Sequence, residues 1–294
     1  MQDVIVIGGS YAGMAAALQL ARARRKVVVI DAGQRRNRFA SHSHGFLGQD
    51  GVDPAIIWAE ARRQLLAYPA VRWIEGTAST ITGRKDDFRV PTEAGDTFAG
   101  RRILLATGVS DQLPEIPGLA ERWGGTVFHC PYCHGYELDQ GRIGVIASSA
   151  MSLHQAQLLP EWGEVTFLTN SALSLDPEQR ADLQARGVTI EETPISRLTG
   201  AADIELRDGR VLPFAGLFTA TRTEPASALA EMAGCTLIET PMGRQIMTGD
   251  GKETSVPGIF ACGDVARAPH SVSLAVGDGA WAGAQLHRSL VWPE

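Results

Sequence analysis

Two cysteines separated by two residues carry the clearest chemical signal in this sequence. They lie in the segment His129-Cys130-Pro131-Tyr132-Cys133-His134-Gly135. Two thiols at this spacing can close a disulfide across one turn of backbone. They can also be held poised for thiol–disulfide exchange, because their surroundings control the thiolate fraction and the reduction potential of the pair. The spacing therefore predicts redox chemistry, if the other uses of the same pattern can be set aside.

Three other uses of the pattern must be weighed. Cys-Pro-Tyr-Cys is a glutaredoxin-like active-site sequence, Cys-x-x-Cys-His attaches c-type haem, and Cys-x-x-Cys is half of a zinc site. A glutaredoxin-type domain of about 100 residues would place the pair after one short strand near its start, which does not fit. Haem attachment requires export, and zinc needs two more ligands, whereas Cys235 and Cys262 form no second pair. We expect no metal site, and these two cysteines in the core or near a cofactor.

Composition and charge exclude several classes of protein. The 294 residues suffice for one large or two medium domains, and 44% apolar with 20% charged residues is ordinary for a globular protein. A net charge of −6 argues against a general nucleic-acid binder. No apolar run approaches the roughly 20 residues that span a bilayer, and Met1-Gln2-Asp3 lacks the basic character of a signal peptide. We expect a cytoplasmic protein without nucleic-acid or membrane partners, in which a close cysteine pair is catalytic rather than structural.

The N-terminal segment has the layout of a dinucleotide-binding unit. Its predicted elements are a strand (Val4–Ile7), a glycine-rich turn, a helix (Met14–Ala21) and a second strand (Lys26–Ile30). Gly8 permits the tight turn, Gly13 lets the helix approach the strand, and the helix N-terminus offers N–H groups to a pyrophosphate. Asp31 ends the second strand, where an acid accepts from a ribose hydroxyl. Ser10 replaces the middle glycine of the fingerprint, so the motif alone is only moderately specific.

The next part of the chain predicts a helix, a small sheet and a returning strand. The helix covers Pro54–Tyr68, and Arg102–Gly108 is a buried strand. Between them an antiparallel meander is expected, from the segments Val71–Ile74, Ala78–Thr82, Phe88–Pro91 and Asp96–Ala99. His42 and His44 lie in the preceding loop, either facing solvent or near a cofactor. Pro114 then marks a domain boundary.

A second strand–turn–helix–strand layout follows the cysteine pair. It comprises Ile143–Ile146, Leu153–Trp162 and Val165–Leu168, but its turn, Ala147–Ser152, has no glycine, and Thr169-Asn170-Ser171 follows without a charged residue. A helix and a strand are then predicted over Asp176–Arg186 and Val188–Thr193, and a hairpin around Asp208-Gly209. Near the end, a strand runs into Gly263-Asp264, and a last helix is expected from about Gly277.

Four ordered motifs make the sequence resemble low-molecular-weight thioredoxin-reductase-like flavoproteins, a type of pyridine nucleotide-disulfide oxidoreductase. They are the Gly8–Gly13 turn with Asp31, the strand end Leu105–Gly108, the cysteine pair, and Ile259–Val265. The resemblance implies an α/β fold of two Rossmann-like dinucleotide-binding domains, the second inserted in the first. The FAD-binding domain would comprise residues 1–113 and 241–294, and the NAD(P)-binding-like domain, residues 114–240, would carry the cysteines. Members of the family are usually homodimers.

The resemblance also implies roles for individual residues. Cys133 would be the flavin-side thiol and Cys130 the thiol that exchanges with substrate. His134 stands where thioredoxin reductases carry an acid; its imidazole can take the proton of a thiol, and its cation favours a neighbouring thiolate. His129 and His270 are further candidates for proton transfer. The positions implied for FAD binding are Gly8, Ser10, Gly13, Asp31, Thr107, Gly108, Gly263 and Asp264.

The second, glycine-free turn sets the expected direction of electron flow. A 2′-phosphate on NADPH needs arginines or lysines after the second strand, and Thr169-Asn170-Ser171 supplies none. We expect NADPH to reduce the flavin weakly or not at all. Whether NADPH is a second cofactor stays open. The segment Cys130–Glu137 is similar to that of dithiol oxidases that close disulfides in gliotoxin- and holomycin-type natural products. The leading hypothesis is thus an FAD-dependent dithiol oxidase with O2 as acceptor. A thioredoxin reductase using NADPH or another reductant and a non-catalytic flavin redox sensor are the alternatives, and the substrate is a small dithiol or a protein disulfide.

Overall fold

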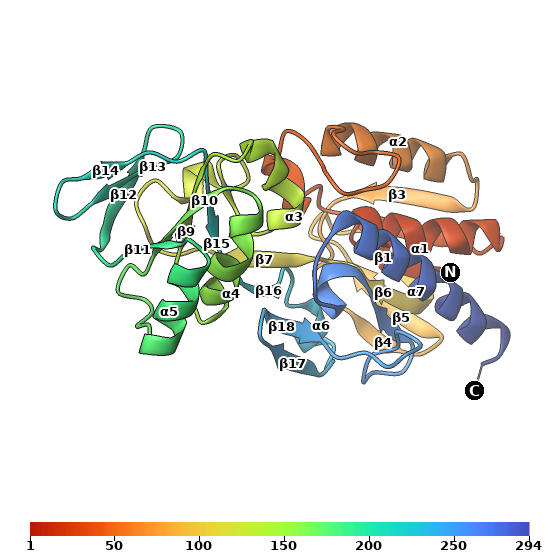
Figure 1. Ribbon diagram of the computed structural model, residues 1–294. Coiled ribbons are helices and arrows are strands. Elements are labelled where there is room, and N and C mark those ends of the chain that lie inside the picture. Colours follow the sequence, from red (N-terminus) through yellow and green to blue (C-terminus); the bar gives the residue numbers. More distant parts are fainter. Residues whose placement is uncertain (294) are drawn as a thin grey trace. The chain divides into compact units, whose positions relative to one another are not determined.

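The computed structural model describes residues 1–293, which divide into two compact units (Figure 1). Unit 1 comprises Met1–Arg38, Phe46–Ser110 and the chain from Thr223 onward, and unit 2 comprises Phe39–Gly45 and Asp111–Arg222. Residues 223–240, expected in the inserted domain, cluster with unit 1. They do so because strand β17 (Leu237–Thr240) pairs antiparallel with β18 (Gly243–Ile246). The binding roles of the two domains stay predictions.

Unit 1 is built on a sheet with the order β3-β2-β1-β6-β5-β4, in which β19 also pairs with β6. The strands β1, β2, β3, β6 and β19 are parallel to their neighbours, whereas β4, β5 and the start of β6 form an antiparallel extension. The central strands are apolar on both faces, as a parallel sheet covered by helices requires. The strands are β1 (Gln2–Ile7), β2 (Val27–Asp31), β3 (Val71–Glu75), β4 (Thr82–Arg84), β5 (Asp87–Pro91), β6 (Thr97–Leu105) and β19 (Ile259–Ala261).

The expected four-stranded meander was wrong in two respects. The segment predicted at Val71–Ile74 is β3, which pairs parallel with β2 in the main sheet. The two strands expected on either side of Gly100 are one continuous strand, β6, which pairs with β5 through its first half and with β1 through its second. The predicted segments were separated at Gly100-Arg101, which lie inside β6. Arg102, at the start of the second segment, is fully buried, and its charge is paired with Asp86 at 2.9 Å.

Helices α1 (Tyr11–Arg22) and α7 (Val272–Val291), from opposite ends of the chain, lie side by side in unit 1 (Figure 1). A Cβ at Gly279 of α7 would lie 2.1 Å from the carbonyl oxygen of Ala12, so the close packing requires glycine there. Helix α7 begins five residues before the expected start, because the Ser271 hydroxyl caps it by accepting from Leu274 N–H. The remaining helices of unit 1 are α2 (Pro54–Leu66) and α6 (Leu229–Met232).

Unit 2 contains a five-stranded parallel sheet with the order β11-β10-β9-β15-β8. Its members are β8 (Val127–Phe128), β9 (Arg142–Ile146), β10 (Glu164–Leu168), β11 (Thr189–Glu191) and β15 (Gly216–Thr219). The helices are α3 (Pro131–His134), α4 (Met151–Leu158) and α5 (Pro177–Ala185). The predicted hairpin is confirmed as β13 (Asp203–Leu206) with β14 (Val211–Leu212), joined by β12 (Ile195–Thr199). Strands β7 (Val109–Gln112) and β16 (Arg222–Pro225) lie where the chain passes between the units.

Within residues 1–293, no helix combines the length and the apolar character that crossing a bilayer requires.

Candidate redox and nucleotide-binding sites

The cysteine pair lies at the start of the short helix α3 in unit 2. Cys130 is its N-cap residue, with extended backbone, and Pro131 occupies the first helical position, for which its fixed φ is suited. The N–H of Cys133 donates to the carbonyl of Cys130 at 3.3 Å, so one turn of backbone joins the two residues. Both are half-buried. This local geometry suits a pair that opens and closes a disulfide.

His134 ends α3 with its ring stacked on Phe128, at 4.2 Å between ring centroids and 16° between ring planes. Burial, and secondarily the charge of His44, lower the pKa of His134 from 6.5 to about 4. The imidazole is therefore neutral near pH 7. A ring whose pKa lies this far below that of a thiol is a weak acceptor for the thiol proton, and a neutral ring offers a neighbouring thiolate no charge. The low pKa therefore favours neither role expected of His134, and both stay predictions.

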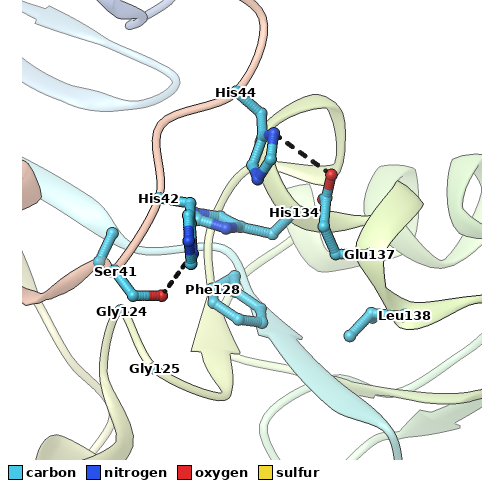
Figure 2. A pocket seen from close by; sticks show the side chains of 10 residues that line it. Ser41, His42, His44, Gly124, Gly125, Phe128, His134, Glu137 and Leu138 are labelled. Carbon is cyan, nitrogen blue, oxygen red and sulfur yellow. Dashed lines mark hydrogen bonds and ion pairs between the residues drawn. The ribbon is translucent and has the colours of Figure 1, made fainter. Parts of the chain in front are cut away.

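A cavity of about 210 Å³ adjoins His134 (Figure 2). Its walls come entirely from unit 2: the loop Phe39–Gly45, the turn at Gly124-Gly125, and the segment that runs from His134 to Leu138. Figure 2 shows His44 and Glu137 pointing toward one another, with His44 Nδ1 3.3 Å from Glu137 Oε1. His42 is exposed and His44 is half-buried, and both line this cavity. A place near the cofactor stays a prediction for both.

The other predicted residues of the redox segment have structural contacts. The carbonyl of His129 accepts from Gln155 Nε2 at 2.8 Å, which anchors the segment to α4, and its ring lies 5.9 Å from that of Trp123.

Cys235 and Cys262 are buried, as expected for core cysteines, and burial raises the pKa of each thiol. Among the described residues, no group of three or more His, Cys, Asp or Glu side chains is arranged to hold a metal.

The β1–α1 turn of unit 1 has the geometry of a pyrophosphate cradle. A Cβ at Gly13 would lie 1.9 Å from the carbonyl oxygen of Gly8, which confirms the close approach predicted for this glycine. Asp31 Oδ1 accepts from Gly9 N–H at 3.0 Å, so this carboxylate is fixed against the turn. Ser10 is the N-cap of α1 but makes no side-chain cap bond. The residues present thus fit a dinucleotide, with the helix N-terminus open to its phosphates.

Sequence reasoning missed Arg36, which joins two of the predicted residues within unit 1. Arg36 Nη1 donates to Asp264 Oδ2 at 3.2 Å and to His270 Nδ1 at 2.8 Å. Because arginine only donates, Nδ1 of His270 is the accepting nitrogen of a neutral ring. The structure therefore places His270 with the Gly263-Asp264 motif, while Thr107 and Gly108 lie in the short connection between β6 and β7.

A second missed pair lies beneath the Gly263 turn. Asp278 Oδ2 accepts from Gly263 N–H at 2.8 Å, and Oδ1 lies 2.6 Å from Lys252 Nζ. Both side chains are largely buried, at 9% and 14% exposure. The acid between two glycines in an otherwise apolar helix, Gly277-Asp278-Gly279, was the one signal in the sequence that could have revealed it.

In the β9–α4 turn of unit 2, a side chain of the same segment accepts hydrogen bonds from two backbone N–H groups. The Ser152 hydroxyl accepts from the N–H groups of Ser148 at 3.0 Å and Ser149 at 3.4 Å. Ser148 Oγ in turn donates to the carbonyl of Ala220 at 2.5 Å. The N–H groups that a phosphate would bind in such a turn are thus already engaged.

Comparison with known proteins gives consistent matches along the whole chain. A family model described as "pyridine nucleotide-disulphide oxidoreductase" matches residues 2–279. "Thioredoxin reductase sirT" of Leptosphaeria maculans is 33% identical, over 97% of this chain and 93% of that protein. An oxidoreductase from Agrobacterium tumefaciens has a crystal structure that is 56% identical, with a TM-score of 0.97 over 100% of this chain and 99% of that one. The crystal structure of HlmI is 35% identical, with a TM-score of 0.91 over 99% and 92%.

Proposed function

This chain belongs to the pyridine nucleotide-disulphide oxidoreductase family, and from that premise we propose that it oxidises small dithiols, with FAD as cofactor and O2 as the final acceptor. The resemblance to thioredoxin-reductase-like proteins and the two-domain Rossmann-type fold are confirmed. The chain is a flavin-dependent disulfide oxidoreductase by family. The substrate, the direction of electron flow and the residue roles are the proposal.

The proposed direction of electron flow rests on the β9–α4 turn, in which a serine hydroxyl already accepts from two backbone N–H groups. Ser148 and Ser149 N–H groups are bonded to Ser152, so a nucleotide pyrophosphate would have to displace a buried hydroxyl. The segment Thr169–Ser171 supplies no cation for a 2′-phosphate. Both features oppose electron entry from NADPH. We therefore propose that the cysteine pair receives its electrons from a dithiol substrate.

Three residues of the redox segment, Cys130, Cys133 and His134, have proposed roles in this direction. One substrate thiolate attacks Cys130 of the Cys130–Cys133 disulfide and releases the Cys133 thiolate, and the second substrate thiol then displaces Cys130, leaving the substrate oxidised and the pair reduced. His134, the residue after Cys133, is the group proposed to take up the proton that a thiol releases in this exchange. FAD, when bound, would accept two electrons from the reduced cysteine pair and pass them to O2. Gly8, Gly13, Asp31, Gly263 and Asp264 would hold it.

Anaerobic flavin bleaching tests the proposed direction. Dithiothreitol should bleach the visible flavin band of the purified holoprotein as fast as the enzyme turns over, whereas NADPH should bleach it slowly or not at all. Cys130→Ser should retain its flavin and lose bleaching by dithiol. Rapid and complete bleaching by NADPH would overturn the proposal.

A thioredoxin reductase is the second candidate, because several similar curated proteins carry that name. Bleaching by dithiol but not by NADPH, ferredoxin-type or other reductants would exclude it. A flavin redox sensor without turnover is the third, and steady oxygen consumption with a dithiol, lost in Cys130→Ser, would exclude that. A homodimer is expected from the resemblance, and sedimentation would test the oligomeric state; the cytoplasmic location stays a separate prediction.

A further inference from the structure

We propose that the cavity beside His134 binds the non-sulfur part of the substrate, and that the Glu137 carboxylate makes it select small dithiols without negative charge. This inference rests on the proposed function and names the class of substrate for it. It gives Glu137 and the loop Phe39–Gly45 a role in specificity that the cysteine motif alone does not reveal.

The position of the cavity follows from the chain that builds it. His134, Glu137 and Leu138 form one wall, and all three lie within five residues of Cys133. The loop Phe39–Gly45 forms another wall and is tied to the first by the contact between His44 and Glu137. A molecule held here is therefore held by the same short segment that carries the redox pair.

The volume of the cavity limits what can enter it. Its 210 Å³ corresponds to roughly seven water molecules at about 30 Å³ each. Pockets for drug-sized ligands are larger, at about 300–1,000 Å³. The cavity can therefore take a small molecule or a fragment of one, but the surface of a folded protein could insert only a single side chain.

The lining offers a flat apolar face and hydrogen-bonding groups. The stacked rings of Phe128 and His134 provide the flat face, and Figure 2 shows the imidazoles of His42 and His44 grouped near them. Imidazoles can donate and accept hydrogen bonds. Glu137 is the one acidic side chain among the residues that line the cavity. A negatively charged dithiol is therefore repelled, and a neutral, flat one is accepted.

Removing the carboxylate should change charge selection in a known direction. The test compares kcat/KM at pH 8 for dianionic meso-2,3-dimercaptosuccinate and for neutral 1,2-benzenedimethanethiol. In Glu137→Gln the ratio of the anionic to the neutral substrate should rise roughly threefold to tenfold, the effect of one charge at several ångströms in a partly solvated site. Glu161→Gln, an exposed carboxylate of unit 2 outside the cavity, should leave the ratio unchanged.

Filling the cavity should separate substrates by size. Gly125 lines it, has no left-handed backbone, and a Cβ there would make only ordinary contact, 3.6 Å from Arg122 O. Gly125→Leu should therefore fold and lower kcat/KM for 1,2-benzenedimethanethiol at least tenfold, through KM. Gly249→Leu, at an open position away from the cavity, serves as the matched control and should have no such effect.

The outcomes distinguish this inference from the function on which it rests. If no dithiol bleaches the flavin of the natural protein, both fail. If dithiols bleach it but the charge ratio of Glu137→Gln stays at the natural value, the cavity is not where the substrate is held and only the inference fails. Preference for a reduced thioredoxin-type protein over the small neutral dithiols would equally overturn it. The charge ratio decides the matter by itself should Gly125→Leu prove unstable on heating.

Discussion

The β1–α1 turn of unit 1 and the β9–α4 turn of unit 2 share a strand–turn–helix layout, yet their backbone N–H groups meet different acceptors. In unit 1 the N-cap Ser10 makes no side-chain bond, and Gly9 N–H is held by Asp31. In unit 2 the hydroxyl of Ser152, the second residue of the helix, accepts from two successive N–H groups of the turn. A single buried serine can thus take the place of a phosphate oxygen, so that a nucleotide-binding layout persists without an open binding turn.

The strand ends beyond the two turns differ in the same way. Strand β2 ends in Asp31, which accepts from Gly9 N–H through Oδ1 and is predicted to bind a ribose hydroxyl. After β10 the residue in the corresponding register is Thr169. The next residue, Asn170, accepts through Oδ1 from Ile195 N–H at 2.8 Å and so fixes the chain toward β12. Unit 2 therefore has a threonine where unit 1 has an acid, and the predictions below test how complete that contrast is.

The largest effect is expected at the glycine that only unit 1 retains. Gly13→Val places side-chain atoms where the carbonyl oxygen of Gly8 already lies, 1.9 Å from the Cβ position. The turn must move, so the purified protein should lose its flavin, with affinity falling more than 100-fold, as measured by the absorbance ratio of flavin to protein. Ser10→Gly, which restores the fingerprint, should keep its flavin. A yellow Gly13→Val protein would show that the close approach is not needed.

A large loss of stability is expected when the pair beneath the Gly263 turn is broken. Asp278→Asn keeps a hydrogen-bond acceptor for Gly263 N–H but leaves the Lys252 ammonium without its partner in a largely buried site. We expect a loss of about 2–4 kcal/mol in the free energy of unfolding, with weaker flavin retention, measured by urea titration followed by flavin fluorescence. Glu60→Gln breaks the exposed pair with Arg63 and should barely move the midpoint. Equal effects of the two substitutions would refute a special role for Asp278.

The redox segment of unit 2 should make stability depend on pH. The folded pKa of His134, about 4, lies below its unfolded value near 6.5. The unfolded chain therefore binds the proton first, so stability is fully present above pH 6.5 and is lost as pH falls toward 4, by up to about 3 kcal/mol. Urea midpoints from pH 7.5 to 4.5 should fall more steeply in the natural protein than in His134→Asn. His154→Asn, an exposed histidine of α4, should follow the natural protein, and parallel curves for all three would contradict the burial argument.

Local patterns made some of these features predictable, and long-range contacts hid the rest. The β1–α1–β2 unit and the hairpin at Asp208-Gly209 follow from neighbouring residues, so the sequence alone sufficed. The parallel pairing of β3 depends on a partner some 40 residues earlier, which alternation within the strand cannot reveal. Arg36 meets Asp264 across 228 residues, and a basic residue in a loop gives no sign of such a contact. The β9–α4 turn is the intermediate case. The sequence shows that the glycines are missing, but it does not show that the Ser152 hydroxyl accepts the hydrogen bonds that a phosphate would otherwise accept.

The smallest effect, and the most direct test of the contrast, is expected at Ser152. Ser152→Ala removes the acceptor of two turn N–H groups and should cost about 1 kcal/mol, as lost helix caps do, measured by urea titration against Ser174→Ala, an exposed serine. The turn N–H groups would then be released, but Thr169–Ser171 still supplies no cation and the turn still lacks glycine. Bleaching of the flavin by NADPH should therefore stay far slower than bleaching by dithiothreitol. If Ser152→Ala instead brought NADPH to the rate of the dithiol, the hydroxyl alone would separate the two turns, and the missing glycines and arginines would carry no weight in the difference.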